Sequence, residues 1–323
     1  MSGSVRATIH ASARILVAAV LTAAVGAVAA PFAYITNQGS NDVSVIDLEQ
    51  RKVVATVAVG RAPAGIAVSS ATARAFVSNP ESRTLSVIDL ASNRVVDTLP
   101  GGDGPVGIAV SPDGSRVWLA DWFSNEVLVF DGTSHHLIAR IPVGIAPAGL
   151  VVHPDGKRVF VANRDSNTVS VIDADALAVT GELVAGNHPF AVALDPAGAR
   201  LYTVNVWSDD VTVFDTASGR RLANVAVGRS PYGAAVDGQA GRVFVTNQHA
   251  DSVSVIDAGT LQVVATVPVG GYPEGIAVHG GRVYVVNWMD DNVAVMDASS
   301  FEVLGTVETG KNSRGFGQFI GAP

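Results

Sequence analysis

The feature that most constrains the fold is a unit of about 42 residues that recurs along this 323-residue chain. An aspartate, a proline and an aromatic residue mark each copy. The aspartates are Asp47, Asp89, Asp131, Asp173, Asp215, Asp257 and Asp297, spaced 42 residues five times and then 40. The prolines are Pro63, Pro105, Pro147, Pro189, Pro231 and Pro273, and the aromatics are Tyr34, Phe76, Trp118, Phe160, Tyr202, Phe244 and Tyr284. Seven copies in phase indicate a repeat architecture, in which each unit stacks on its neighbours.

Each copy has the pattern of four short strands, as residues 145–186 illustrate. The strand-like segments "AGLVVH", "RVFVAN", "TVSVID" and "AVTGELVAG" are separated by turn sequences such as "PDGK" and "RDSN". Four antiparallel strands in 42 residues are the size of one β-propeller blade. The composition agrees, because 48% of the residues are hydrophobic and only 15% are charged, which is typical of a strand-rich buried fold.

The chain ends indicate how the ring closes. The repeats begin at "PFAYITN", which corresponds to a second strand, and the missing innermost strand has its counterpart in "KNSRGFGQFIG" at 311–321. We therefore expect an all-β, seven-bladed propeller of four-stranded blades. The C-terminal strand should complete the N-terminal blade, whose other strands come from residues 32–59. Residues 30–323 should form one propeller domain.

Residues 1–29 have the pattern of a secretory signal peptide. Arg6, His10 and Arg14 precede an uncharged run that ends in small residues, with a cleavage motif at Ala27 to Ala29. Export to the periplasm or the medium is the leading interpretation, and an uncleaved membrane anchor is the alternative. The apolar run is shorter than the roughly 20 residues that span a bilayer, so we expect no membrane span after cleavage.

Charge and cysteine content exclude several classes of function. Cleavage would remove two arginines from 21 basic residues and none of the 29 acidic ones, which leaves 19 − 29 = −10. Such a protein is a poor general binder of nucleic acid or anionic membranes. The sequence has no cysteine, so disulfides, thiolate metal sites and covalently attached c-type haem are excluded. We expect no cofactor.

The segments "YITNQGSNDVSVID", "VANRDSNTVSVID" and "VTNQHADSVSVID" resemble the YVTN-repeat (YncE-like) β-propeller family, over about residues 32–320. The resemblance implies the fold and export from a bacterial cell. It specifies function poorly, since one branch is associated with nucleic-acid binding and others with cell-surface or redox systems. It implies no catalytic residue for this chain.

Function should lie where copies depart from the repeat. In a blade, the turns between the second and third strands lie on the same face as the crossings between blades, so departures in both should meet there. The predicted ligand-binding residues are His188, Phe190, Trp207, Arg229, Tyr232, His249, Tyr272, Glu274, Trp288, Met289, Lys311 and Arg314. Trp122 and Phe123 are a further departure in the third blade. Aromatic walls with convergent polar groups are typical of a binding site.

Three interpretations of this face remain open. The leading one is an exported binding or scaffold protein, monomeric, that recognises a small molecule, a peptide or an envelope protein. The second is a lactonase-like hydrolase or lyase, in which His188 or Glu274 acts as base while Arg229 and Arg314 stabilise an oxyanion. The third is binding of single-stranded nucleic acid by stacking, which the acidic charge disfavours. No metal site is expected, because the histidines lack a short ligand spacing.

Overall fold

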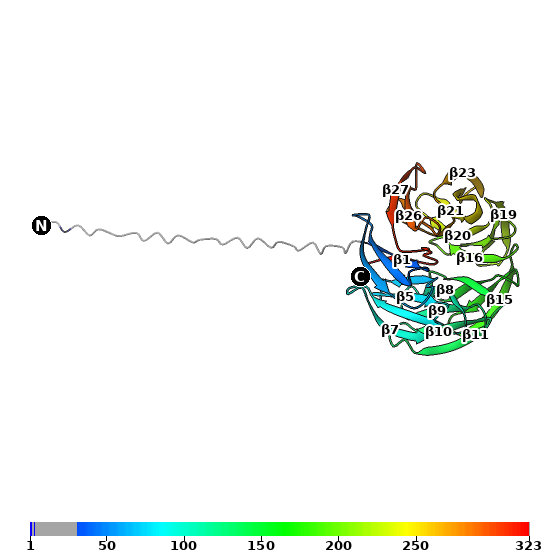
Figure 1. The fold of residues 1–323 in the computed structure, drawn as a ribbon, viewed down its shortest axis with the longest axis horizontal. Helices are drawn as coiled ribbons and strands as arrows, with labels where there is room; N and C mark the ends of the chain where they lie inside the picture. The colour runs from blue at the N-terminus through cyan, green and yellow to red at the C-terminus, as the bar shows by residue number, and fades with distance from the viewer. Residues whose placement is uncertain (2, 4–30, 323) are drawn as a thin grey trace.

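The computed structural model describes residues 1, 3 and 31–322, and these confirm the all-β propeller. Seven four-stranded antiparallel sheets are arranged around a central axis (Figure 1). The expected signal peptide lies almost wholly outside the described residues. Within the described part of the chain, no helix is long and apolar enough to cross a membrane.

The strands follow the repeat closely, with four to each blade. The first blade contains β28(Ile320–Gly321), β1(Phe32–Asn37), β2(Asp42–Asp47) and β3(Lys52–Ala58), and the second contains β4(Ile66–Ser69), β5(Arg74–Asn79), β6(Thr84–Asp89) and β7(Arg94–Pro100). The third contains β8(Pro105–Val110), β9(Arg116–Asp121), β10(Glu126–Asp131) and β11(Leu137–Pro142), and the fourth contains β12(Pro147–Val152), β13(Arg158–Asn163), β14(Thr168–Asp173) and β15(Ala178–Val184). The fifth contains β16(Pro189–Leu194), β17(Arg200–Asn205), β18(Asp210–Asp215) and β19(Arg221–Ala226). The sixth contains β20(Pro231–Asp237), β21(Arg242–Asn247), the 3-10 helix η1(Gln248–Ala250), β22(Ser252–Asp257) and β23(Gln262–Pro268), and the seventh contains β24(Pro273–His279), β25(Arg282–Asn287), β26(Asn292–Asp297) and β27(Val303–Glu308).

The C-terminal strand completes the first blade. β28 pairs antiparallel with β1, with Ala33 opposite Ile320, and the amide of Tyr34 donates to the carbonyl of Phe319 at 2.8 Å. Phe319 is fully buried in the same apolar cluster as Tyr34. The two ends of the propeller are thus held in one sheet, which leaves no unpaired blade edge at the closure.

Repeated residues form the framework. The marker aromatics of all seven copies are buried at 4% exposure or less, and Phe76, for example, lies in one apolar cluster with Ile108 and Leu119 of the next blade. The marker aspartates close the turn after the third strand, as at Asp257, whose Oδ1 accepts from the amides of Gly259 and Thr260 at 3.0 and 2.9 Å. Such Asx turns satisfy backbone donors that the sheet leaves free.

Candidate functional site

One repeated contact fixes the face on which the crossings and the second-to-third turns meet. The amide of His188 donates to Oδ1 of Asn167, 21 residues earlier, at 2.8 Å, and the amide of Ser230 donates to Asp209 at 2.7 Å. The same contact recurs at Ala62, Ala146, Tyr272 and Asn312. Each turn therefore holds the next crossing in place. The face of the ring on which these turns and crossings lie is called here the crossing face.

A first aromatic cluster lies on the third, fourth and fifth blades. The imidazole of His188 stacks on the indole of Trp207, with 3.4 Å between ring centroids and 20° between planes. The guanidinium of Arg164 lies 5.7 Å from the centroid of Trp207 and 5.3 Å from that of Trp122, and its Nη1 pairs with Asp165 at 2.7 Å. Trp207 is still 66% exposed. The indole of Trp207 is thus exposed to solvent while it stacks on His188 and contacts Arg164.

His188 is electrostatically tuned by this cluster. Burial lowers the pKa of its imidazole below the ordinary value, and the nearby charge of Arg164 lowers it further, while Asp165 opposes both. Nδ1 of His188 is buried without a hydrogen-bond partner among the described residues, and it lies 3.7 Å from Asp165. A neutral imidazole is the form expected to stack on Trp207 near neutral pH.

A second aromatic cluster lies on the sixth and seventh blades. Ring centroids of His249 and Tyr272 are 5.3 Å apart, and those of Tyr272 and Trp288 are 5.6 Å apart. Nε2 of His249 lies 3.1 Å from the Tyr272 hydroxyl, and its Nδ1 lies 2.9 Å from Oγ of Ser230. Nε1 of Trp288 donates to Oε1 of Gln38 at 3.1 Å, a partner from the first blade that the sequence did not single out.

The cationic side chains on this face already have partners. Nη2 of Arg229 donates to the carbonyl of His249 at 2.8 Å, and Nζ of Lys311 lies 3.1 Å from a carboxylate oxygen of Asp291. Lys311 is 75% exposed in that pair. Arg229 and Lys311 therefore belong to the same face as the aromatic clusters, but each is tied locally and they do not converge on one point.

Glu274, Arg314 and Tyr232 form a buried group rather than an open one. Glu274 is 2% exposed, and its carboxylate accepts from Nε of Arg314 at 2.6 Å and from Nε2 of Gln248 at 2.8 Å. The Arg314 guanidinium also donates to the Tyr232 hydroxyl at 2.5 Å. The predicted base and oxyanion-stabilising group are thus engaged with each other. His188, the alternative base, lies in a different cluster.

Burial governs the ionisation of this group. It raises the pKa of Glu274, which Arg314 and Gln248 oppose, and it raises the pKa of Tyr232 above the usual range. Burial alone would lower the pKa of Arg314, but the neighbouring Glu274 carboxylate raises it above the ordinary value. Arg314 therefore stays charged and Tyr232 stays a phenol at any ordinary pH.

Apolar rings fill the axis beside this ion pair. Phe190 and Tyr232 have ring centroids 4.2 Å apart, and Phe316 lies 5.0 Å from Phe190 and 5.8 Å from Tyr232. Phe190 and Tyr232 are at most 7% exposed. Phe190 and Tyr232, which follow crossing prolines, and Phe316 thus fill this end of the axial channel.

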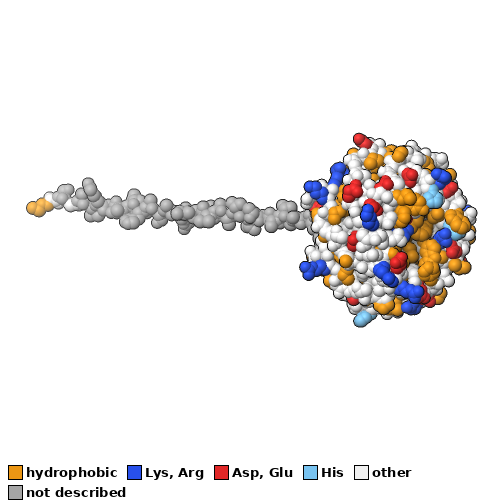
Figure 2. Space-filling model, viewed as in Figure 1, with side chains coloured by type: hydrophobic (Ala, Val, Ile, Leu, Met, Phe, Trp, Pro, Cys, Tyr) orange, Lys and Arg blue, Asp and Glu red, His pale blue; other side chains and the backbone are white. Residues whose placement is uncertain are grey.

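The most exposed large apolar side chains of the crossing face come from its turns and crossings: Phe123 at 74%, Trp207 at 66%, Met289 at 64% and Ile145 at 56%. In the view of Figure 2, hydrophobic side chains gather over the region where Figure 1 places β16 and β20, and charged side chains are scattered around them.

Among the residues that the structure describes, no group of three or more His, Cys, Asp or Glu side chains is placed to hold a metal ion.

Comparisons with known proteins agree with the fold. A family model described as YNCE-like beta-propeller matches residues 19–155, 150–242 and 234–323. No curated protein is significantly similar to the chain in sequence.

Three solved structures illustrate the likeness. Hydrazine synthase of Kuenenia stuttgartiensis is 23% identical with a TM-score of 0.73, covering 82% of this chain and 92% of that one. A functionally unknown protein from Desulfotomaculum acetoxidans is 18% identical with a TM-score of 0.78, covering 90% and 98%. The dihydro-heme d1 dehydrogenase NirN, solved in complex with DHE, is 17% identical with a TM-score of 0.67, covering 86% of this chain and 63% of its own. At such identities the likeness concerns the fold alone.

Proposed function

Because the chain belongs to the YNCE-like β-propeller family, we propose that it is an exported binding protein whose recognition surface is the aromatic sector of the crossing face. This sector consists of the clusters around Trp207 and Trp288, together with Phe123 and Met289. The partner is a peptide or protein of the cell envelope. The N-terminal sequence of residues 1–29 supports export.

Trp207 supports the proposal because its side chain is exposed and yet already held in place. Its ring is two-thirds exposed, yet His188 stacks on it at 3.4 Å and Arg164 lies over it at 5.7 Å. An exposed aromatic that is already held in place loses little conformational entropy when a partner covers it. Tryptophan, tyrosine and arginine are also the residues that most often dominate binding energy at protein interfaces.

The buried ion pair argues for binding rather than catalysis at this face. A general base must reach the proton that it removes. Glu274 is almost fully buried and both of its oxygens are hydrogen-bonded, to Arg314 and to Gln248. The pair instead fastens the C-terminal segment to the seventh blade, which is a structural task.

Binding of single-stranded nucleic acid is the second candidate, favoured by one observation. Trp122, Arg164 and Trp207 form a ladder of planar groups on which bases could stack. The chain carries a formal net charge of −8, and Arg229 and Lys311 are already paired. These charges oppose the capture of a polyanion, so the peptide or protein partner is preferred.

The test compares capture of envelope proteins by the wild-type protein with capture by Trp207→Ala and by Val54→Ala. Val54 is half-exposed on the outer strand β3 and serves as the matched control. A partner that wild type and Val54→Ala retain and Trp207→Ala loses supports the proposal. Equal retention by all three proteins would refute it. Capture of an oligothymidine at low salt that Trp207→Ala abolishes would select the nucleic-acid candidate instead.

A further inference from the structure

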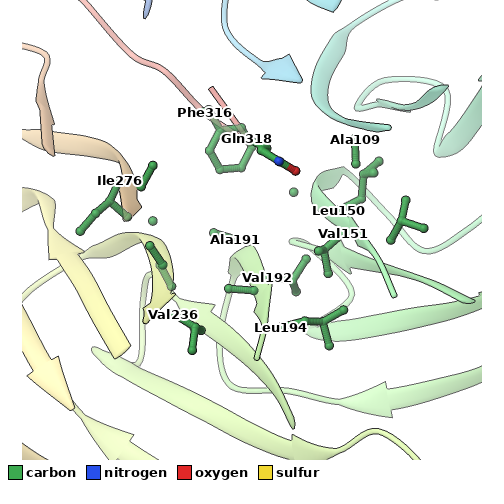
Figure 3. Close-up of a pocket in the computed structure, with 18 of the residues that line it drawn as sticks. Ala109, Leu150, Val151, Ala191, Val192, Leu194, Val236, Ile276, Phe316 and Gln318 are labelled. Carbon is green, nitrogen blue, oxygen red and sulfur yellow. The ribbon is translucent and has the colours of Figure 1, made fainter. Parts of the chain in front are cut away.

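A cavity of about 560 Å³ lies inside the ring, separate from the aromatic sector. Its wall is built from the inner strands β8, β12, β16, β20 and β24 and from the segment 316–318. Figure 3 shows Leu150, Val192 and Val236 among the side chains around it. None of its lining residues carries a charged side chain.

The C-terminal segment gives the cavity its shape, because it departs from the repeat. Amides of Ile66 and Val68 donate to the carbonyls of Phe316 and Gln318 at 2.8 and 2.9 Å, so the segment lies against β4. Gly317 has a φ of 117°, and a Cβ there would lie 2.4 Å from the carbonyl oxygen of Ile66. Only glycine permits this approach. The segment thus covers β4, and residues 316–318 line the cavity where β4 would otherwise do so.

The cavity has a closed end and an open end. Phe316 closes it towards the crossing face, where its ring packs with Phe190 and Tyr232. At the other end the lining includes Pro112 and Pro154, which lie in turns between first and second strands. A ligand would therefore enter from the face opposite the aromatic sector, and the two sites would be independent.

Gln318 has the one polar side chain among the residues that line the cavity, whose other polar groups belong to the backbone. Gln318 is exposed, and among the described residues its side-chain amide makes no hydrogen bond, while Figure 3 shows it beside Phe316 with its amide extending into the cavity. We propose that the cavity is a second binding site, for an uncharged and mainly apolar small molecule that forms a hydrogen bond with the side chain of Gln318.

Size and charge define this ligand class. Ligand pockets typically have volumes of about 300–1,000 Å³, with apolar walls and few polar groups. A charged ligand would lose its hydration without meeting an opposite charge, which is costly. The amide of Gln318 donates through its NH₂ group and accepts through its oxygen, so a carbonyl on the ligand can accept a hydrogen bond from it and a hydroxyl can accept or donate one.

The test titrates the purified protein with N-phenylnaphthylamine, an uncharged dye whose fluorescence rises in apolar surroundings. We expect saturable binding at one site, weakened by at least about tenfold in Gln318→Trp, where the indole fills the cavity. Gln318→Leu should keep the dye but lose the preference of the wild-type site for naphthol over naphthalene as a competitor. Val192→Phe fills the cavity from another strand if the tryptophan variant does not fold.

Two controls separate this site from the aromatic sector. Trp207→Ala and Val54→Trp should bind the dye like wild type, because both positions lie outside the lining of the cavity. A folded wild-type protein without saturable binding would overturn the proposal, and so would undiminished binding by both cavity-filling variants. Loss of the dye in Trp207→Ala would also overturn it, since the dye would then report the crossing face.

Discussion

The imidazole of His188 lies nearly parallel to the indole of Trp207, with 3.4 Å between their centroids, although the two residues are 19 positions apart in sequence. His188 sits in the crossing into the fifth blade and Trp207 in the turn between that blade's second and third strands. The amides of Val206 and Trp207 donate to the carbonyls of His188 and Asn187 at 3.0 and 3.2 Å, which fixes the two segments side by side. The stack is therefore set by backbone geometry.

Trp207→Ala should change the free energy of unfolding by no more than about 0.5 kcal/mol, because an exposed ring contributes little to the core. Trp118→Ala is the matched comparison, since Trp118 is fully buried and its loss should cost about 3–5 kcal/mol. Denaturant unfolding of both variants measures the difference. A comparable loss in the two variants would mean that Trp207 is a core residue.

His188 should titrate with a pKa below the ordinary value of about 6.5, because burial and Arg164 disfavour its charged form. A depressed folded-state pKa means that the unfolded state binds more protons as the pH falls. The stability that His188 contributes is thus present above its unfolded pKa and lost as pH drops through the folded value. NMR titration of the imidazole checks this, with Trp207→Ala expected to move the midpoint upward. A midpoint at or above the ordinary value contradicts the stacked neutral form.

Arg314→Met should destabilise the protein by about 3–5 kcal/mol, because it leaves the buried Glu274 carboxylate without its cation. Removing both charges, as Glu274→Leu with Arg314→Met, should cost less than the single change. Thermal and denaturant unfolding of the two variants give the comparison. If the double variant is as unstable as the sum of both single variants, the two side chains do not act as a pair.

Deletion of residues 311–323 should unfold the propeller, because it removes β28, the buried Phe319 and the Arg314 ion pair together. Circular dichroism and size-exclusion chromatography of the truncated protein measure this. A truncated protein that melts cooperatively near the wild-type temperature would show that ring closure by the C-terminal segment is dispensable.

The repeat was sufficient to predict the fold, because period and marker residues determine where strands and turns fall. It also placed Trp207, Tyr272 and Trp288 on the crossing face, since their positions in the copies are equivalent to those of Gly39, Ala62 and Gln38. Because all copies share one backbone geometry, the position of a residue within its copy determines the face on which it lies.

Contacts between blades could not be predicted in the same way. Arg164 reaches Trp122 and Trp207, and Gln38 reaches Trp288, because long side chains span neighbouring blades in directions that the period does not specify. The burial of Glu274 and Arg314 had a sequence signal that could have indicated it. The equivalent position after the crossing proline is Ala64, Val106 or Ala148 in earlier copies, which is typical of an inward-facing site.

In the proposed function, the exposed aromatic residues of the crossing face recognise a partner. The most direct measurement is the affinity of a captured envelope protein for wild type and for the combined variant Phe123→Ser, Trp207→Ser and Met289→Ser, with Val54→Ser on the outer strand as control. The proposal predicts a loss of at least about 2 kcal/mol in binding free energy for the combined variant, with unchanged unfolding and an unaffected control. Undiminished affinity of a folded combined variant would contradict it.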